Sequence, residues 1–279
     1  MNLRFSLLSG VADLESFGSE TIFSYRVGEF EVFVLVEATG QGFANVIQGA
    51  TESQLQRYLP KGTYQSATNT FLVRTPERIF LIDTGFGDAL FDRLKAVEVE
   101  PEHIDAILLT HLHNDHIGGL TQGTDALFPW STLYMAEPEY KHWTVTNPDP
   151  GVMNTLAPYN ARLMTFTPKP FGAERLNLFP GMSAIASFGH TPGHTMYLIE
   201  SDGEALLFCG DLIHVQDIQF AFPELGVIFD VDPDAASANR DYVLEYCAET
   251  GIPIAGVHLR YPAIGTVQRD HGAFKFESF

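Results

Sequence analysis

The chain has 279 residues, of which 45% are hydrophobic and 12% aromatic, and its formal net charge at pH 7 is −19. This composition excludes an intrinsically disordered chain, because enough apolar surface is available for a sizeable core. The negative charge argues against nucleic acid and anionic membranes as partners, since both require a basic surface. No apolar stretch reaches the roughly 20 residues of a membrane span. We therefore expect one globular domain over residues 1–279.

The opening residues 1–8 carry one positive charge and a short apolar segment. This pattern is too weak for a signal peptide, so we expect a cytoplasmic location, although a longer precursor stays open. Cys209 and Cys247 lie in segments with strand and helix patterns. We expect them to be core thiols rather than a disulfide bridge.

Strands and helices alternate in the first half of the chain. A helix is expected from Asp88, because Leu90, Leu94 and Val97 share one face. Pro76 fits the turn of a hairpin. Four apolar runs have patterns typical of strands: residues 30–36, 69–74, 79–82 and 104–110.

The second half continues this alternation. Helices are expected to begin at Glu137 and at Asp232, the second ending at Gly251. The Asp202-Gly203 pair predicts a tight hairpin turn between two of the strands. Four further runs have strand patterns: residues 132–135, 196–200, 205–209 and 252–257.

Three histidines and one aspartate occur within six positions directly after the fourth strand. Imidazole nitrogens and carboxylate oxygens are ligands that zinc and similar cations accept readily. One such residue alone could be a helix N-cap or a surface ring. Four clustered titratable groups are unusual in a loop without a functional site, so the pattern favours a metal site. The four residues are His111, His113, Asp115 and His116.

Three later residues follow the same design, because each stands where an apolar strand or turn ends: His190, Asp211 and His258. Taken singly each is a weak candidate, since polar residues at strand ends are common. Strand ends at one edge of a sheet converge, however, so these residues can meet the first cluster.

The whole set suits two ions, each with an open coordination position, about 3.5–4 Å apart. The side chains divide into His111, His113 and His190 at one ion, Asp115, His116 and His258 at the other, and Asp211 bridging the two.

These motifs resemble the metallo-β-lactamase-fold hydrolase superfamily. The resemblance rests on the run HLHNDH at 111–116, Thr191-Pro192-Gly193-His194, Gly210-Asp211, His258 and the early Asp83-Thr84-Gly85. It extends from about Thr70 to the end of the chain. It implies an α/β (α+β) fold, a four-layer αββα sandwich with the dinuclear site at one edge of the two sheets.

Within the superfamily, residues 210–215 and 258–265 are similar to the methyl parathion hydrolase branch. That branch and its lactonase relatives act on phosphotriesters, lactones and esters. One departure matters, because quorum-sensing lactonases carry a tyrosine shortly after the bridging aspartate and this chain has His214 there. The lactonase mechanism therefore cannot be transferred intact.

The predicted function is hydrolysis of a small-molecule lactone, aryl ester or phosphotriester by a hydroxide that bridges two divalent metal ions. Metal binding lowers the pKa of water from 15.7 towards about 7. Asp115 and Asp211 are the predicted catalytic carboxylates, and Asp211 orients the nucleophile. Zinc is the expected metal, with manganese, iron or cobalt as alternatives. A homodimer is expected by analogy with the named branch alone.

Supporting roles are open at several positions. Asp83 could hold a ligand imidazole or stabilise its own turn, and His214 could donate to substrate or pack in the core. Residues 147–170, rich in Pro, Asn and Thr, predict a loop over a cleft. Five aromatic residues are candidates for the wall of an apolar pocket, although most aromatic residues in such a sandwich are core: Phe128, Trp130, Trp143, Phe171 and Phe220.

Four other functions are weighed against this one. A thioesterase resembling glyoxalase II usually has a basic patch for glutathione, and the C-terminal region has few positive charges. An iron-dependent persulfide-type oxygenase uses one ion, so a complete second site argues against it. A non-catalytic ligand-binding relative is disfavoured by the complete ligand set. A nuclease is disfavoured by the charge. The natural substrate is not fixed by the sequence.

Overall fold

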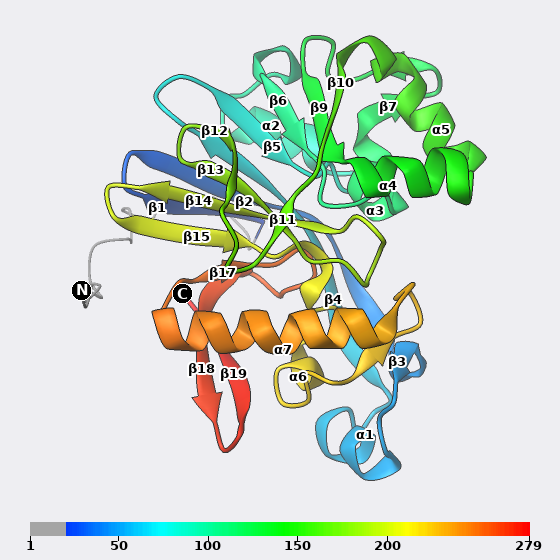
Figure 1. The fold of residues 1–279 in the computed structure, drawn as a ribbon, viewed down its shortest axis with the longest axis vertical. Helices are drawn as coiled ribbons and strands as arrows, with labels where there is room; N and C mark the ends of the chain where they lie inside the picture. Colours follow the sequence, from blue (N-terminus) through cyan, green and yellow to red (C-terminus); the bar gives the residue numbers. More distant parts are fainter. Residues whose placement is uncertain (1–20) are drawn as a thin grey trace.

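The computed structural model describes residues 21–279. Residues 1–20, which include the segment considered as a signal peptide, lie outside the described residues, so the prediction of one domain over 1–279 stays a prediction. Two large β-sheets pack face to face, with helices on their outer sides (Figure 1). Within residues 21–279, no helix is both long and apolar enough to cross a membrane.

The first sheet has seven strands, and residues alternate between its two faces. Val32 and Val34 enter the apolar cluster between the sheets, whereas Phe33 and Leu35 enter a second cluster beneath the outer helices. Both faces are therefore buried, as the apolar runs predict. In spatial order the strands are β1 (Ile22–Val27), β2 (Phe30–Phe43), β4 (Thr63–Arg74), β5 (Ile79–Ile82), β6 (Ala106–Leu108), β9 (Thr132–Ala136) and β10 (Leu163–Phe166).

The second sheet contains the β14–β15 hairpin, whose turn is Asp202-Gly203 as predicted. Its strands in spatial order are β11 (Lys169–Pro170), β13 (Met182–Ala186), β14 (Thr195–Ser201), β15 (Glu204–Phe208), β17 (Ile254–Ala255), β18 (Ile264–Asp270) and β19 (Ala273–Ser278), with β12 (Leu176–Phe179) beside β13. Two small ribbons pair β3 (Ile47–Gln48) with β16 (Gly226–Val227) and β7 (Thr121–Gln122) with β8 (Asp125–Ala126).

Helices form the two outer layers. In Figure 1, α7 lies on one side of the molecule and α4 and α5 lie on the other. Leu90 and Leu94 of α2 pack in the cluster beneath the first sheet, and Val243 and Leu244 of α7 pack against the second sheet. The helices are α1 (Glu52–Tyr58), α2 (Leu90–Ala96), α3 (Asn114–Ile117), α4 (Glu137–Lys141), α5 (Pro150–Leu156), α6 (Gln216–Gln219) and α7 (Pro233–Thr250).

The predicted fold, a four-layer αββα sandwich of the metallo-β-lactamase type, is confirmed. The predicted caps of α7 are also present, because the Asp232 side chain accepts a hydrogen bond from the Ala235 N–H and Gly251 is left-handed with φ 74°. Cys209 and Cys247 are buried free thiols, as expected.

The predicted loop over residues 147–170 is wrong. This stretch contains α5, a 3₁₀ segment (Ala157–Arg162), edge strand β10 and the short strand β11. Asp149 caps α5 by accepting a hydrogen bond from the Val152 N–H, and Pro150 follows at the first helical position. The Pro and Asn content therefore marks a capped helix start here rather than a long loop.

Candidate metal centre

Four chain segments that follow strands meet at one edge of the sandwich. The run 111–116 follows β6, the 187–194 turn joins β13 to β14, a 3₁₀ turn (Gly210–Leu212) follows β15, and His258 follows β17. All seven predicted ligands come together here. His111, His113 and His190 form what we call the first group, Asp115, His116 and His258 form the second group, and Asp211 lies between them.

The three imidazoles of the first group point their nitrogens at one small volume. His111 Nε2 lies 2.9 Å from His113 Nδ1 and 3.2 Å from His190 Nε2. His190 Nε2 lies 3.1 Å from His113 Nδ1. Burial, with the neighbouring His190, lowers the pKa of His113 to about 3, so this ring is neutral. A neutral imidazole is the form that binds a metal.

Asp211 faces both groups. Its Oδ1 lies 3.1 Å from His116 Nε2, while its Oδ2 lies 3.3 Å from His190 Nε2 and 3.1 Å from His258 Nε2. Asp115 completes the second group, with Oδ2 3.5 Å from His258 Nε2 and Oδ1 3.8 Å from His116 Nε2. The one carboxylate thus contacts ligands of both groups, as a bridging residue must.

Two buried atoms identify this edge as a place for a cation. His116 Nε2 and Asp211 Oδ1 are shielded from solvent and lack a hydrogen-bond partner of normal geometry among residues 21–279. Buried polar atoms are normally satisfied, and each orphan requires an explanation. Nitrogen and carboxylate donors that converge without partners fit borderline divalent cations. The residues present therefore fit two metal ions.

Three of the five ligand histidines, one in the first group and two in the second, have a second partner that fixes the ring. Asp83 Oδ2 lies 2.7 Å from His116 Nδ1, and Asp230 Oδ1 lies 2.9 Å from His190 Nδ1. The Ala67 carbonyl is 2.9 Å from His258 Nδ1. Such partners select the tautomer that presents the other nitrogen to a metal.

The Asp83 carboxylate lies against a ligand imidazole, which is the first of the two roles considered for it. The Asp83 backbone is left-handed with φ 57°, and its carboxylate accepts hydrogen bonds from the Thr110 N–H and hydroxyl as well as facing His116. His194 also holds a ligand, because its Nε2 accepts the Asp211 N–H at 3.0 Å. Burial, with neighbouring His190, lowers the pKa of His194 to about 3, which keeps Nε2 available as an acceptor.

His214 faces the site rather than packing in an apolar core. Its Nε2 lies 3.0 Å from Asp211 Oδ2, and its ring stacks on His258 at 5.1 Å between centroids. Neither ring nitrogen has a hydrogen-bond partner of normal geometry among the described residues. Asp211, His214 and His258 therefore form a further set of converging metal-capable atoms.

The site opens into a cleft of about 490 Å³. Its walls carry Phe86, Tyr64 and Phe229 beside the polar Ser66 and Thr68. Among the described residues that line it, there is no lysine or arginine. The long second half of β2 and the start of β4 build one wall, which the sequence pattern did not predict because residues 38–43 lack a clear apolar alternation.

The predicted aromatic wall is corrected. Phe128 is fully buried in the cluster under the first sheet, and Phe220 packs against Phe276 in the core. Trp130 is 71% exposed and is not among the residues that line the cleft. An apolar run cannot reveal which aromatic faces a cavity, because a core position and a pocket position have the same composition.

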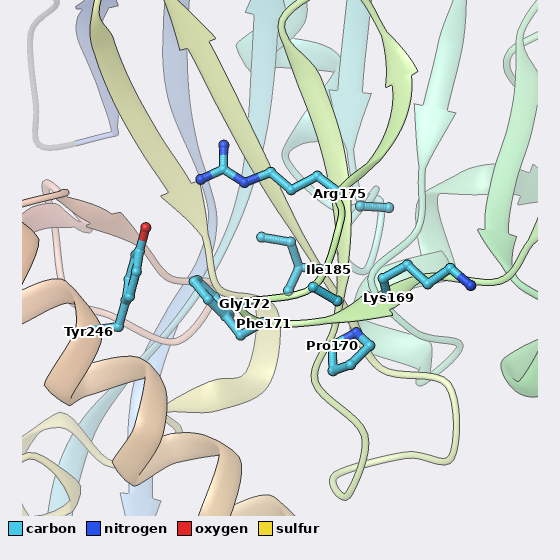
Figure 2. A pocket seen from close by; sticks show the side chains of 9 residues that line it. Lys169, Pro170, Phe171, Gly172, Arg175, Ile185 and Tyr246 are labelled. Atoms are coloured by element: carbon cyan, nitrogen blue, oxygen red, sulfur yellow. The ribbon is translucent and has the colours of Figure 1, made fainter.

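A second hollow of about 200 Å³ lies between β11, β13 and α7 (Figure 2). Tyr246 of α7 packs against Phe171, with ring centroids 4.7 Å apart. Arg175 at its edge is already paired with Glu200. No metal-capable group is found among its lining residues within the described chain, so it is unlike the first cleft.

The sandwich with seven converging ligands defines a metal-binding class of α/β protein. The profile of the "Metallo-beta-lactamase superfamily" matches residues 63–246, which is more than half of the chain. The chain belongs to this superfamily, whose members are typically dependent on two metal ions.

Several solved structures and curated proteins are similar to it. A structure described as hydrolase AbOPH in the beta lactamase superfamily is 28% identical, with a TM-score of 0.85 over 94% of this chain and 98% of that one. AidC, a dizinc quorum-quenching lactonase in complex with a product N-hexnoyl-L-homoserine, is 25% identical, with a TM-score of 0.83 over 93% and 97%.

Similarity among curated sequences is more partial. The hydroxyacylglutathione hydrolase of Aeromonas hydrophila is 26% identical over 64% of this chain and 59% of its own length. The atrochrysone carboxyl ACP thioesterase of Passalora fulva is 32% identical over 55% of this chain and 40% of its own. The chain spans about half the length of the curated relatives it matches.

Proposed function

We propose that the protein is a dinuclear-metal-dependent hydrolase of uncharged ester-type small molecules, namely lactones, aryl esters or phosphotriesters. The observation that carries the proposal is the convergence of seven ligands on a cleft lined without any lysine or arginine among the described residues. The cleft volume of about 490 Å³ is in the range of small-molecule sites. The similarity to AidC adds support.

The first and second groups would each hold one divalent ion, with Asp211 shared. When bound, such ions polarise a carbonyl or phosphoryl oxygen and lower the pKa of water towards about 7. Zinc is our preferred metal because nitrogen and oxygen donors suit it. Asp211 and Asp115 orient the attacking oxygen by accepting its hydrogen bonds. His214 is among the residues that line the cleft, with its Nε2 3.0 Å from Asp211 Oδ2, and the role we propose for it is donation to substrate.

Uncharged substrates are favoured by the electrostatics of the cleft. Away from the metal ions, a substrate carboxylate or phosphodiester brings negative charge, which a site normally neutralises with arginine or lysine. The chain has a formal charge of −19, so distant charges give no compensation. Phe86 and Phe229 are 41% and 48% exposed and can cover an aryl or acyl group.

A thioesterase resembling glyoxalase II is the second candidate. It is supported by the several hydroxyacylglutathione hydrolases among the similar sequences. Glutathione carries two carboxylates, however, and the described lining residues include no cation to receive them. A thioester with an uncharged acyl and thiol part would fit the same cleft.

The decisive experiment is a hydrolysis panel with zinc-loaded and with manganese-loaded protein, after its metal content has been measured. We expect turnover of acyl-homoserine lactones, aryl esters or phosphotriesters that is abolished by chelation and restored by metal. Turnover of glutathione thioesters alone would favour the second candidate. Hydrolysis that survives complete metal removal would overturn both, and one iron per chain would favour an oxygenase.

Two accompanying expectations are part of the proposal. A homodimer is proposed only by analogy with the methyl parathion hydrolase branch, and sedimentation analysis tests it. A cytoplasmic location is proposed as the default, and fractionation of the native cells tests it.

A further inference from the structure

Glu139 is a buried carboxylate to which neither the sequence pattern nor the ligand set assigns a role. It lies in α4, is 1% exposed and accepts four hydrogen bonds. Its Oε1 accepts from the Leu112 N–H at 3.0 Å and from Trp143 Nε1 at 2.6 Å. Its Oε2 accepts from the Thr191 hydroxyl at 2.6 Å and from the Gly193 N–H at 2.9 Å.

Three of the four donors, Leu112, Thr191 and Gly193, come from the two loops that carry the first group. Leu112 stands between His111 and His113, while Thr191 directly follows His190. The two carboxylate oxygens of Glu139 bind different segments. Oε1 accepts from the 111–113 segment and from Trp143, and Oε2 accepts from the 191–193 turn. One side chain therefore joins two segments that are about 80 positions apart in the chain.

Close packing shows that the junction is tight. A Cβ on Gly193 would stand 2.2 Å from the Glu139 nitrogen and 2.5 Å from its Cβ, so only glycine allows the turn to approach α4. Trp143, held by the same carboxylate, lies edge-on against His113 with ring centroids 5.6 Å apart. Each histidine of the first group is therefore next to a residue that donates a hydrogen bond to Glu139. Leu112 stands between His111 and His113, and Thr191 follows His190.

We infer that Glu139 is a positioning residue, which sets the relative place of the two loops so that the first group forms a single metal site. It does not touch substrate or the ligands themselves. The inference rests on the proposed ligand assignment and on the four-acceptor geometry. All four neighbours are donors, so a carboxylate satisfies every one, whereas an amide offers one acceptor oxygen and presents its own donors to the rest.

The main test is Glu139→Gln, with Glu137→Gln as the matched control. Glu137 lies in the same helix and is paired with Lys141 on the surface. Zinc affinity is measured on each purified protein by competition with a chromophoric chelator, and the cobalt(II) absorption spectrum reports the coordination of each site. We expect Glu139→Gln to weaken zinc binding at the first group by about 10–100-fold, while the second group changes less than threefold.

The spectrum separates positioning from general stability. In Glu139→Gln, the absorption bands of the cobalt ion at the first group should shift and lose intensity. Glu137→Gln should keep the spectrum of the starting protein. A variant that is less stable but binds both ions with unchanged affinities and spectrum would refute the positioning role. This readout needs no substrate, so its failure is distinct from failure of the proposed hydrolysis.

A second variant guards against a Glu139→Gln protein that does not fold. Thr191→Val removes one of the four donors and keeps the shape of the side chain. We expect a smaller loss, about 3–10-fold, at the same ion. The double variant should lose less than the product of the two single losses, because both act through one carboxylate. Losses that multiply independently would overturn the inference.

Discussion

The first and second groups of ligands reach the same edge of the sandwich but are supported in different ways. In the first group, the His111 and His190 side chains are 0% and 3% exposed, and carboxylates from distant segments hold the surrounding loops. In the second group, His116 is likewise fully buried and faces Asp83, but the Asp115 and His258 side chains are 26% and 13% exposed, and His258 is held by a backbone carbonyl.

This difference indicates that the two ions would be bound with different affinities and would exchange at different rates. The first group is part of the folded core, because Asp230 holds His190 while Glu139 holds the turn beside it. Both groups contribute to the lining of the cleft, but the Asp115 and His258 side chains of the second group are more exposed than His190 of the first. We therefore expect the first ion to be bound more tightly and the second ion to exchange more readily.

Asp211 is the residue common to both groups, so its loss should have the largest effect. We expect Asp211→Ala to reduce kcat by about 10³-fold and to lower the metal content below two ions per chain. Kinetics on the best substrate from the panel, together with metal analysis, measure this. Full activity with two bound ions would refute the assignment of Asp211. Asp217→Ala, at a surface ion pair with Arg260, is the control.

Arg240 tests whether the buried polar groups behind the first group contribute to the stability of the fold. The guanidinium is 1% exposed and donates to the carbonyls of Leu212, Pro223 and Leu225, and it lies 4.0 Å from Asp230. Arg240→Met leaves these groups unpaired, so we expect the free energy of unfolding to fall by about 3 kcal/mol. Urea denaturation of the metal-free protein measures it. The surface variant Arg260→Met should lose less than about 1 kcal/mol, and equal losses would contradict the comparison.

The two carboxylates behind the histidines provide a symmetrical test. Asp230→Asn should weaken zinc at the first group about 10–100-fold, and Asp83→Asn should do the same at the second, each leaving the other ion nearly unchanged. Stepwise titration with a chromophoric chelator measures both affinities. Asp234→Asn, on the exposed start of α7, is the control. A variant that weakened both ions equally would show that the two groups are not separable.

The sequence predicted the parts of this comparison that depend on local pattern. The ligands follow apolar strands, and their residue types are unusual for loops, so His111 and Asp211 were recognisable before the fold was known. The caps of α7 and the β14–β15 turn were recognisable for the same reason, since each depends on neighbouring residues only.

The supports of the first group could not be predicted in this way. Asp230 reaches His190 across 40 positions, and Glu139 reaches Gly193 across 54. Neither carboxylate has a local signal, because Glu139 lies in an ordinary helical turn and Asp230 in an irregular segment. Burial is set by tertiary packing, which also explains why Phe128 and Phe220 were wrongly expected in the cleft.

The smallest expected effect concerns the aromatic walls. Phe229 lines the cleft, whereas Trp130 is exposed elsewhere. Phe229→Ala removes apolar surface that a bound aryl or acyl group would cover, and burial of about 40 Å² is worth about 1 kcal/mol, or about fivefold in KM. We expect kcat to change little, because Phe229 is not among the metal-capable groups. Trp130→Ala should leave KM within twofold. A KM that responds to Trp130 and not to Phe229 would place the substrate outside the cleft and would remove the argument that its uncharged lining selects an uncharged substrate.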